Sequence, residues 1–337
     1  MKYTVGVQFI NDGFTDCILE NADKINEVYF SWGDFPNARN NQIVSEGYLQ
    51  CEMYDKQREV LKKLSDNNIA LNLLLNGNCY GKYSLERAFF EKIGNTVDYI
   101  RGNYGLNSVT TTSPVIAKFL KSNFSNIYVR ASVNMEIGTI EGMDYISEYF
   151  DGFYMKREYN RDFDKIKELR DWCDKKGKTL HILANSGCLN NCSIHTFHDN
   201  IVSHENEIMK MDNCYEFQCI CDEYLKNHEK RVVLVKNTNF IRPEDVHYYE
   251  EYFDSMKLAT RVSDKAILIL KSYIKGKYIG NILELLEPNH AGRIYPYLIE
   301  NSKLNNSYLF CNKKCLTCDK CAENYKKALV ELIAFEE

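Results

Sequence analysis

The stretch Thr-Leu-His-Ile-Leu-Ala-Asn-Ser-Gly-Cys occupies residues 179–188 and combines two features that recur along the chain. An apolar run of strand length, 179–184, is followed directly by polar residues and by the thiol of Cys188. Runs of this kind alternate with segments of helical spacing. Such alternation is typical of a parallel sheet wrapped by helices.

The apolar runs predict about eight strands, each with polar residues at its carboxyl end. Strand-like runs occupy 3–9, 24–32, 69–75, 97–100, 108–111, 127–133, 150–156, 179–184 and 255–258, with a further apolar run at 232–235. Helical spacing occupies 50–64, 163–176 and 263–275, and helices should begin near Pro114 and within 241–245. The pattern favours an α/β fold, a (β/α)8 TIM-like barrel, over a doubly wound open sheet. No Gly-x-Gly-x-x-Gly turn or Walker loop supports that second fold as a nucleotide binder.

Two regions are predicted from the change of pattern after Arg261. Residues 1–265 should form the barrel with a central cysteine site, and 266–337 a helical, cysteine-rich C-terminal extension. The net charge of −5 and the pI near 5.9 argue against a broad basic surface for nucleic acid. With no leader-like start and no apolar run of about twenty residues, we expect a cytoplasmic protein without a membrane span.

The central cysteines follow the strand that ends near Ala184. Cys188 and Cys192 begin the group, and Cys214, Cys219 and Cys221 follow within about thirty residues. In a chain of 13 cysteines without a secretory leader, clustered thiols indicate metal binding rather than disulfides. We expect Cys188, Cys192, Cys214 and Cys219 to bind an iron–sulfur cluster, with Cys221 as the alternative fourth ligand; zinc accepts the same thiolates.

A second group, Cys311, Cys315, Cys318 and Cys321, lies near the end of the chain among lysines. Thiolates so close in sequence repel one another, and a bound cation or cluster offsets that repulsion. This quartet is predicted to hold a second 4Fe-4S cluster or, alternatively, a structural zinc ion. For the central group, buried thiols that serve only as small apolar residues are the simpler alternative.

Basic residues follow several of the predicted strands. In a barrel they would surround one mouth, where arginine and lysine can hold a carboxylate or phosphate. The candidate catalytic residues are Arg157, Lys236, Lys257, Arg261 and His198, and Arg161 would stand beside them. His195 and His198, three residues apart, could share a helical face just past Cys192. The candidate cofactor-binding residues, within or directly after strands, are Asn76, Arg130 and Asn185.

The cysteine loop, with Ile241-Arg-Pro-Glu-Asp245 and Lys257-Leu-Ala-Thr-Arg261, resembles the collagenase-like peptidase U32 family over roughly residues 1–285. The resemblance implies a barrel carrying a 4Fe-4S cluster on Cys188, Cys192 and Cys219. Members similar to this chain are implicated in oxygen-independent hydroxylation of RNA bases or of a quinone ring, with prephenate as oxygen donor. The sequence has no Gly-x-Ser-x-Gly elbow and no His-Glu-x-x-His pair to support proteolysis.

The leading prediction is therefore an iron–sulfur enzyme that hydroxylates or otherwise modifies a nucleotide, a peptide or a small anionic metabolite. Its partners would be a small, prephenate-like anion and an RNA or peptide acceptor. The alternatives are a metal-binding subunit of a partner protein, without catalysis, and a U32-type peptidase.

Overall fold

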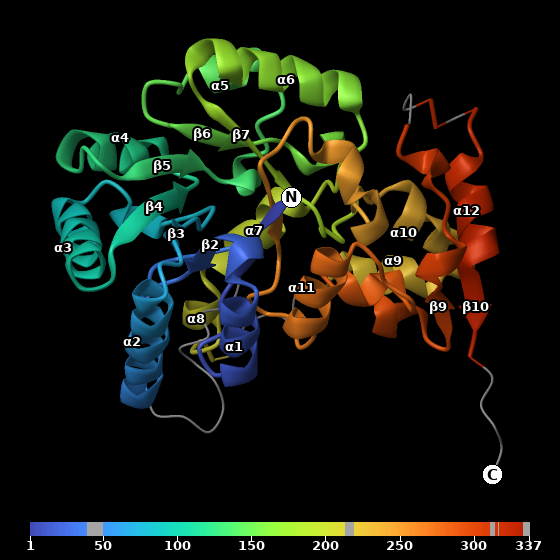
Figure 1. Cartoon of the computed structure of the whole chain (residues 1–337), viewed down its shortest axis with the longest axis horizontal. Helices are drawn as coiled ribbons and strands as arrows, with labels where there is room; N and C mark the ends of the chain where they lie inside the picture. The colour runs from blue at the N-terminus through green and yellow to red at the C-terminus, as the bar shows by residue number, and fades with distance from the viewer. Residues whose placement is uncertain (39–49, 213–218, 311–313, 316, 333–337) are drawn as a thin grey trace.

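The first strand pairs in parallel with both the second and the eighth strand, and this pairing closes the sheet into a barrel. The computed structural model describes residues 1–38, 50–212, 219–310, 314–315 and 317–332. Helices follow the strands around the barrel, which confirms the predicted (β/α)8 architecture. Figure 1 shows the first part of the barrel and its helices in blue to green, while the eighth strand, which closes the barrel, and the helix that follows it are orange and the last segments of the chain are red.

The strands alternate with helices in chain order. The barrel strands are β1 (Lys2–Gly6), β2 (Ile25–Phe30), β3 (Leu71–Leu75), β4 (Leu106–Thr111), β5 (Tyr128–Ala131), β6 (Gly152–Tyr154), β7 (Thr179–Leu183) and β8 (Ser255–Leu258). The helices between them are α1 (Asp12–Glu20), α2 (Gln50–Asp66), α3 (Arg87–Tyr104), α4 (Pro114–Asn123), α5 (Ile140–Asp144) and α6 (Phe163–Lys176). Several shorter helices separate β7 from β8: α7 (His195–Ser203), α8 (Glu205–Ile208), α9 (Ile220–Lys226), η5 (His228–Val232), α10 (Val233–Lys236) and η6 (Pro243–Tyr249). The chain continues with α11 (Ala266–Lys275), β9 (Tyr297–Ile299), α12 (Lys320–Ala328) and β10 (Leu329–Glu331).

Local sequence explains where several helices begin and end. The side chain of Ser113 accepts the Ile116 N–H at the start of α4, and Pro114 occupies the first turn, where no backbone donor is needed. The Asp162 side chain caps α6 in the same way, and Gly177 ends that helix with a φ of 63°. The predicted helix 163–176 is confirmed at both ends.

Two short apolar runs were assigned wrongly. The predicted strand 97–100 lies inside the 18-residue helix α3, and the run 232–235 is helical, in η5 and α10. In α3 the buried side chains recur at Ile93, Val97, Ile100 and Tyr104, a helical period that a four-residue window cannot reveal. The residues Val233, Leu234 and Val235 are all buried, so they show no periodicity, and tertiary packing decides their conformation.

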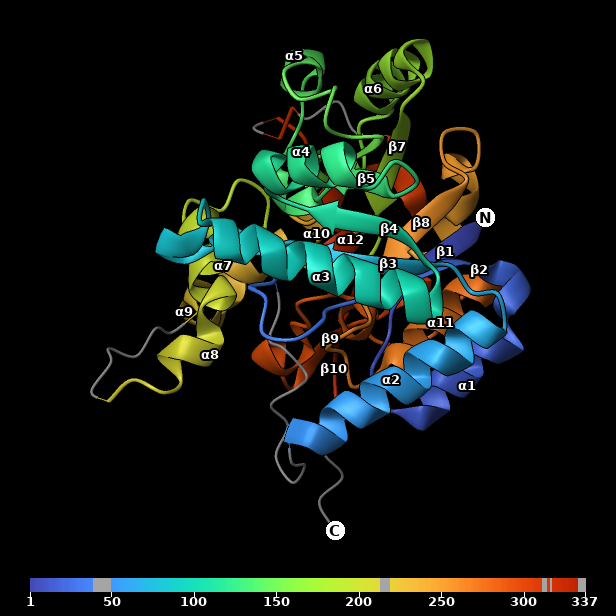
Figure 2. The same cartoon turned by 90° about the vertical axis from the view of Figure 1, so that its left-hand side faces the viewer.

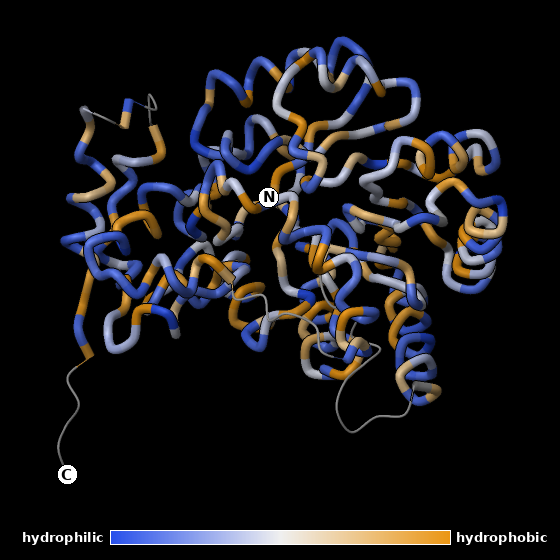
Figure 3. The backbone as a smooth tube through the Cα atoms, turned by 180° about the vertical axis from the view of Figure 1, so that it is seen from behind, coloured by the Kyte–Doolittle hydropathy of each residue, from blue (hydrophilic) through white to orange (hydrophobic). Residues whose placement is uncertain are grey.

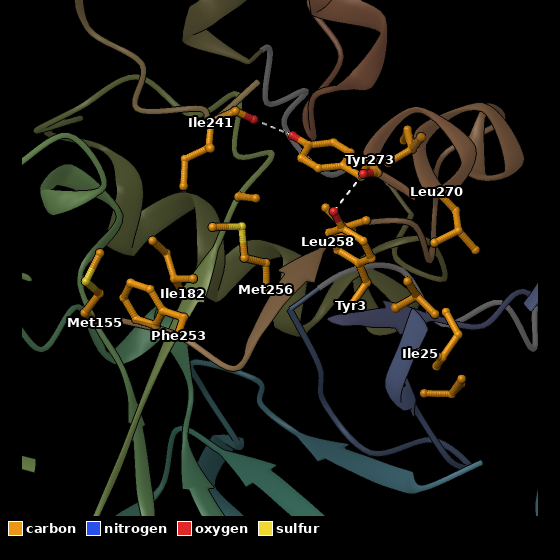
Figure 4. Close-up of a cluster of buried hydrophobic side chains, with 14 of the residues drawn as sticks. Tyr3, Ile25, Met155, Ile182, Ile241, Phe253, Met256, Leu258, Leu270 and Tyr273 are labelled. Carbon is orange, nitrogen blue, oxygen red and sulfur yellow. Dashed lines mark hydrogen bonds between the residues drawn. The ribbon is translucent and has the colours of Figure 1, made fainter. Parts of the chain in front are cut away.

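The apolar core fills the barrel wall and the space beneath the helices. Figure 3 shows hydrophobic backbone segments concentrated toward the middle of the molecule. Figure 4 shows how β1 is tied to α11, because the Tyr3 hydroxyl donates to the Tyr273 carbonyl oxygen over 2.7 Å. The Tyr273 hydroxyl in turn donates to the carbonyl oxygen of Ile241 over 2.6 Å. Two buried tyrosines thus join the first strand, α11 and the segment before η6 through satisfied polar groups.

A buried ion pair occupies the barrel interior between β2 and β5. Both side chains of Glu27 and Arg130 are almost fully buried, and Asn72 and Ser108 donate hydrogen bonds to the same carboxylate. Burial by itself would raise the pKa of Glu27, but the charge and hydrogen bonds of Arg130 outweigh it and hold that pKa below its usual range. Burial and the same guanidinium lower the pKa of His181, whose neutral Nε2 accepts from the Arg130 Nε at 3.1 Å.

The chain after α11 packs onto the barrel. β9 and β10 form a separate antiparallel pair, α12 lies against α10, and buried Tyr308 and Ala328 belong to the same continuous apolar core as the barrel strands. The predicted boundary at 265–266 stays a prediction, and α11 just beyond it packs against α1. In the part of the chain that the structure describes, no helix is both long and apolar enough to span a bilayer.

We expect Glu27→Gln to lower the free energy of unfolding by about 3–5 kcal/mol, because it leaves the buried Arg130 charge without its counter-charge. Since the folded pKa of Glu27 is lowered, this stabilisation is complete above the unfolded carboxyl pKa of about 4.3 and is lost as the pH falls below it. Urea denaturation at pH 7 measures the loss. The control is Asp66→Asn in the exposed Lys62–Asp66 pair, which should change stability by less than about 1 kcal/mol. Equal effects of the two variants would contradict the prediction.

Candidate functional site

A pocket of about 60 Å³ opens among the carboxyl ends of the barrel strands. This volume holds a few water molecules, or one carboxylate or phosphate group. Its floor and walls combine apolar and basic side chains from six strands and the loops that follow them. The lining residues are Tyr29, Ala38, Leu74, Asn76, Val133, Asn134, Arg157, Leu183, Ser186, Lys257, Ala259, Arg261, Val262 and Glu287.

Lys257 and Arg261 come from β8 and from the turn that follows it. Both are buried, with exposed fractions of 8% and 5%. The Lys257 ammonium lies 4.3 Å from the centre of the Tyr29 ring, and an Arg261 Nη2 donates to the Asn37 Oδ1 over 2.6 Å. Burial raises the pKa of the Tyr29 hydroxyl to about 12, although Arg261 acts against the rise. That hydroxyl stays protonated and donates to the Leu258 carbonyl oxygen.

Arg157, just past β6, connects the pocket to the cysteine loop. Its guanidinium is 7% exposed; one Nη lies 3.7 Å from the Cys188 Sγ and the other bonds to the His195 Nε2. Glu136, whose carboxylate is 3.6 Å away, balances part of the charge. Burial, and next the charge of Arg157, lower the pKa of His195 and favour the neutral ring that accepts this bond. A positive side chain is therefore fixed between the pocket and a thiol.

Three uncharged side chains that line the pocket, Asn76, Asn134 and Ser186, each have a buried polar atom without a protein partner. The Asn76 Oδ1 and the Ser186 Oγ are buried and make no hydrogen bond, although the side chains are only 5% and 2% exposed. Buried polar atoms are normally satisfied, and an exception in a pocket indicates a bound water or ligand. Three cations and Glu287, the single carboxylate among the described lining residues, give the pocket a net positive charge.

Three of the predicted thiols come together beside Arg157. Burial, the neighbouring Cys219 and then Cys188 raise the pKa of Cys221 to about 12. Such thiols keep their protons unless a cation is bound among them. Within the described residues, no three His, Cys, Asp or Glu side chains lie close enough to bind one ion. The thiols therefore provide suitable donor atoms for a metal, but they are not arranged as the ligands of one bound ion.

The remaining predicted ligands stand apart from this group or cannot be assessed. Cys192 is half-buried in the same loop, whereas Cys214 and Cys311 lie outside the described residues. In the C-terminal quartet, Cys315 is exposed, and Cys318 and Cys321 are half-buried. Metal binding by the quartet stays a prediction.

Two of the predicted catalytic residues do not line the pocket. Lys236 ends α10 instead of a strand, because the preceding run is helical, and its side chain is therefore not carried to the barrel mouth. His198 is also absent from the lining; the histidine that meets Arg157 is His195, one helical turn earlier in α7. The spacing of the two histidines could not decide between them, since the orientation of α7 is set by tertiary contacts.

Three further predicted residues hold the backbone together. Arg130 is engaged by Glu27 inside the barrel, and Asn185 donates to the carbonyl oxygens of Ala259 and Leu285 while accepting the Ala259 N–H. Arg161 donates to the carbonyl oxygens of Val235 and Phe240. None of the three lines the pocket. Polar residues at strand ends are common in a barrel, and sequence alone cannot tell a ligand contact from a backbone brace.

Comparison with known proteins agrees with the barrel fold. The chain is 26% identical over 315 residues to the "Uncharacterized protease MJ1657" of Methanocaldococcus jannaschii, covering 90% of this chain and 88% of that protein. In fold it is similar to the U32 peptidase Mk0906, with a TM-score of 0.54 over 76% of this chain and 91% of the other at 14% identity. The chain resembles U32 peptidases. The predicted resemblance to U32 peptidases is confirmed. No protein-family model matches this chain.

Asn185, which braces the backbone, and Asn76, which lines the pocket, provide a matched test. Asn185→Ala should lower the free energy of unfolding by about 2–4 kcal/mol, because it leaves three buried backbone groups without their partner. Asn76→Ala should cost less than half as much, since the Asn76 Oδ1 has no protein partner to lose. Denaturant unfolding of both variants measures the difference. A larger loss for Asn76→Ala would mean that this side chain is structural.

Proposed function

We propose that this U32-like chain is an iron–sulfur enzyme that binds a small anionic substrate at the barrel mouth. The observation that carries the proposal is the position of Arg157, which lines the basic pocket and also lies 3.7 Å from the Cys188 thiol. A substrate held by this arginine would therefore lie next to any group bound by the cysteine loop. The reaction class in this proposal is hydroxylation or a related modification of a nucleotide, a peptide or a small anionic metabolite.

Charge and size support an anionic ligand. Lys257, Arg261 and Arg157 approach the pocket from different strand ends, and each is less than a tenth exposed. A cation in such a low-dielectric site attracts an anion more strongly than at the surface. Two arginines can bind a carboxylate or phosphate through paired donors, and a volume of about 60 Å³ is sufficient for such a group. The Ser186 hydroxyl is available as a further donor.

The chemistry of the donor atoms supports the cofactor. Cys188, Cys219 and Cys221 are the described thiols that interact with one another, and Cys192 is the nearest further cysteine along the same loop. A four-thiolate set suits a 4Fe-4S cluster. When bound, such a cluster would supply a Lewis-acidic or redox-active iron. The chain's own residues would hold the anion, exclude water and fix the position of Cys188 through Arg157.

A peptidase is the second candidate, because the relative that covers most of this chain carries the name of a protease. The two candidates differ in their need for iron. Peptide cleavage by protein freed of metal would favour the peptidase. Activity that depends on iron and sulfide, with no cleavage of gelatin or casein, would favour the iron–sulfur enzyme.

Arg261 and Lys236 allow a matched test of the anion site. The sequence predicted both as site residues, but only Arg261 lines the pocket. Arg261→Ala should weaken binding of prephenate or inorganic phosphate by about 1.5–3 kcal/mol, the value of a hydrogen bond to a charged group. Lys236→Ala is the matched control and should leave binding unchanged, because Lys236 lies outside the pocket. Isothermal titration calorimetry measures both. Equal affinity for all three proteins would remove Arg261 from the site.

The cluster is tested by its composition. Cys188→Ala and Cys219→Ala should each abolish most of the iron and acid-labile sulfide in protein purified without oxygen, since a cluster rarely survives the loss of a thiolate. Cys51→Ala, at an exposed thiol on α2, is the control and should keep the full content. Full iron and sulfide in both site variants would exclude these ligands, and stoichiometric zinc in colourless wild-type protein would exclude the cluster.

A further inference from the structure

A cysteine, a histidine and a glutamate converge at a different point on the same face of the barrel. Cys79 lies in the loop between β3 and α3, His204 joins α7 to α8, and Glu207 belongs to α8. Figure 2 shows α7 and α8 at the left, with α3 running across the front of the barrel. The Asn78 N–H donates to the Ser203 Oγ over 2.9 Å and fixes the two segments against each other.

The three side chains are connected in series. The His204 Nδ1 lies 2.6 Å from the Glu207 Oε2, and the His204 ring is close enough to the Cys79 thiol for each group to shift the pKa of the other. Because Glu207 occupies Nδ1, we assign Nε2 to the sulfur. A carboxylate in this position fixes the tautomer and orientation of an imidazole and stabilises its protonated form.

The loop backbone completes the arrangement. The Gly81 N–H points at the Cys79 Sγ over 3.4 Å, and Gly81 has a φ of 67°, a conformation that favours glycine. A Cβ at this position would lie 3.6 Å from the His204 Cε1, so the backbone passes directly beside the imidazole. A backbone donor aimed at sulfur stabilises a thiolate.

The neighbouring groups shift the pKa values of the two partners in opposite directions. The hydrogen bond to His204 lowers the pKa of Cys79, against the effects of burial and of Glu207, and the Gly81 N–H adds to the lowering. The hydrogen bond to Cys79 and the contact with Glu207 raise the pKa of His204. Asp34 and Glu205 are the other charged groups lining the adjoining cavity, and Asp34 is paired with Lys92. Thiolate and imidazolium therefore support each other.

We propose that Cys79, His204 and Glu207 form a nucleophilic site for acyl transfer, with Cys79 as the nucleophile, His204 as the acid and base, and Glu207 as a positioning residue. The substrate class is a compound with an activated carbonyl, such as a thioester, an ester or an amide. Cys79 and His204 are both partly exposed, so a substrate can reach them. A cavity of about 50 Å³, lined by residues 34–37 and 202–207, adjoins the histidine.

The reaction balances with water as the second substrate. The Cys79 thiolate attacks the carbonyl carbon and forms a C–S bond; the bond to the leaving group breaks, and the leaving group takes the proton from His204. Water then gives a proton to His204 and its oxygen to the acyl carbon. The C–S bond breaks, and the thiolate is restored. No step uses the central cysteines, so the site is independent of the iron–sulfur proposal.

Site-resolved alkylation tests the nucleophile in the full-length protein. We expect iodoacetamide at pH 7 to modify Cys79 at least about fivefold faster than Cys51, an exposed thiol without such neighbours, as measured by mass spectrometry of peptides. His204→Ala should bring the Cys79 rate to within about twofold of Cys51, and Glu207→Gln should give an intermediate rate. Because the pKa of Cys79 is lowered, its advantage over Cys51 should grow as the pH falls from 8.5 toward 6.5.

A second probe tests the covalent step. p-Nitrophenyl acetate should acetylate Cys79 in the wild-type protein, and Cys79→Ser should remove the acetylated peptide without altering the melting temperature. Equal alkylation of Cys79 and Cys51 in the wild type would overturn the proposal, whatever the variants do. Fast alkylation without acetylation of Cys79 would overturn acyl transfer, and a His204→Ala variant that kept the wild-type rate would exclude His204 as the partner.

Discussion

Closure of the sheet by β1 and β8 is the constraint on which the site depends. The pairing of Thr4 with Lys257 and of Val5 with Leu258 fixes the last strand against the first. It carries Lys257 over Tyr29 on the second strand and Arg261 to Asn37 in the loop beyond it. Without closure these residues would stand at opposite edges of an open sheet. The basic pocket is therefore a consequence of the backbone hydrogen bonds of one strand pair.

The barrel tolerates buried charge because each charge is balanced in a different way. Deep inside, Arg130 is matched by Glu27, and both side chains are almost fully buried. At the mouth, Arg157 is shared among Glu136, His195 and Cys188 and also lines open volume. Burial of a charge is costly unless it is paired, and partial pairing beside a cavity favours a ligand that completes it. Arginine is therefore structural deep inside the barrel, at Arg130, and available for ligand binding at its mouth, at Arg157.

The long connection between β7 and β8 is where this barrel departs from a plain alternation of strand and helix. It contains the thiols of Cys219 and Cys221, which meet Cys188 near the pocket, and also His204, which meets Cys79 on the other side. One insertion thus supplies partners to two separate strand-end loops. Loops at the carboxyl ends of barrel strands commonly carry function, because the strands position them rigidly.

The sequence by itself determined the fold class, most strand positions and the helix 163–176. It also placed Lys257, Arg261 and Arg157 at strand ends. Hydrophobic periodicity and the polar residues between periodic segments are local properties of the chain, so they can be read from sequence alone. Only the tertiary structure decided that residues 97–100 and 232–235 are helical, that Lys236 leaves the mouth, and that His195 rather than His198 meets Arg157. The tertiary structure also brought together Cys79 and His204, which lie 125 residues apart in the sequence. The neighbouring residues Asn78 and Ser203 are separated by the same number of residues. Contacts of this kind depend on how helices pack against the barrel, and packing energies between distant segments leave no periodic trace in a single sequence.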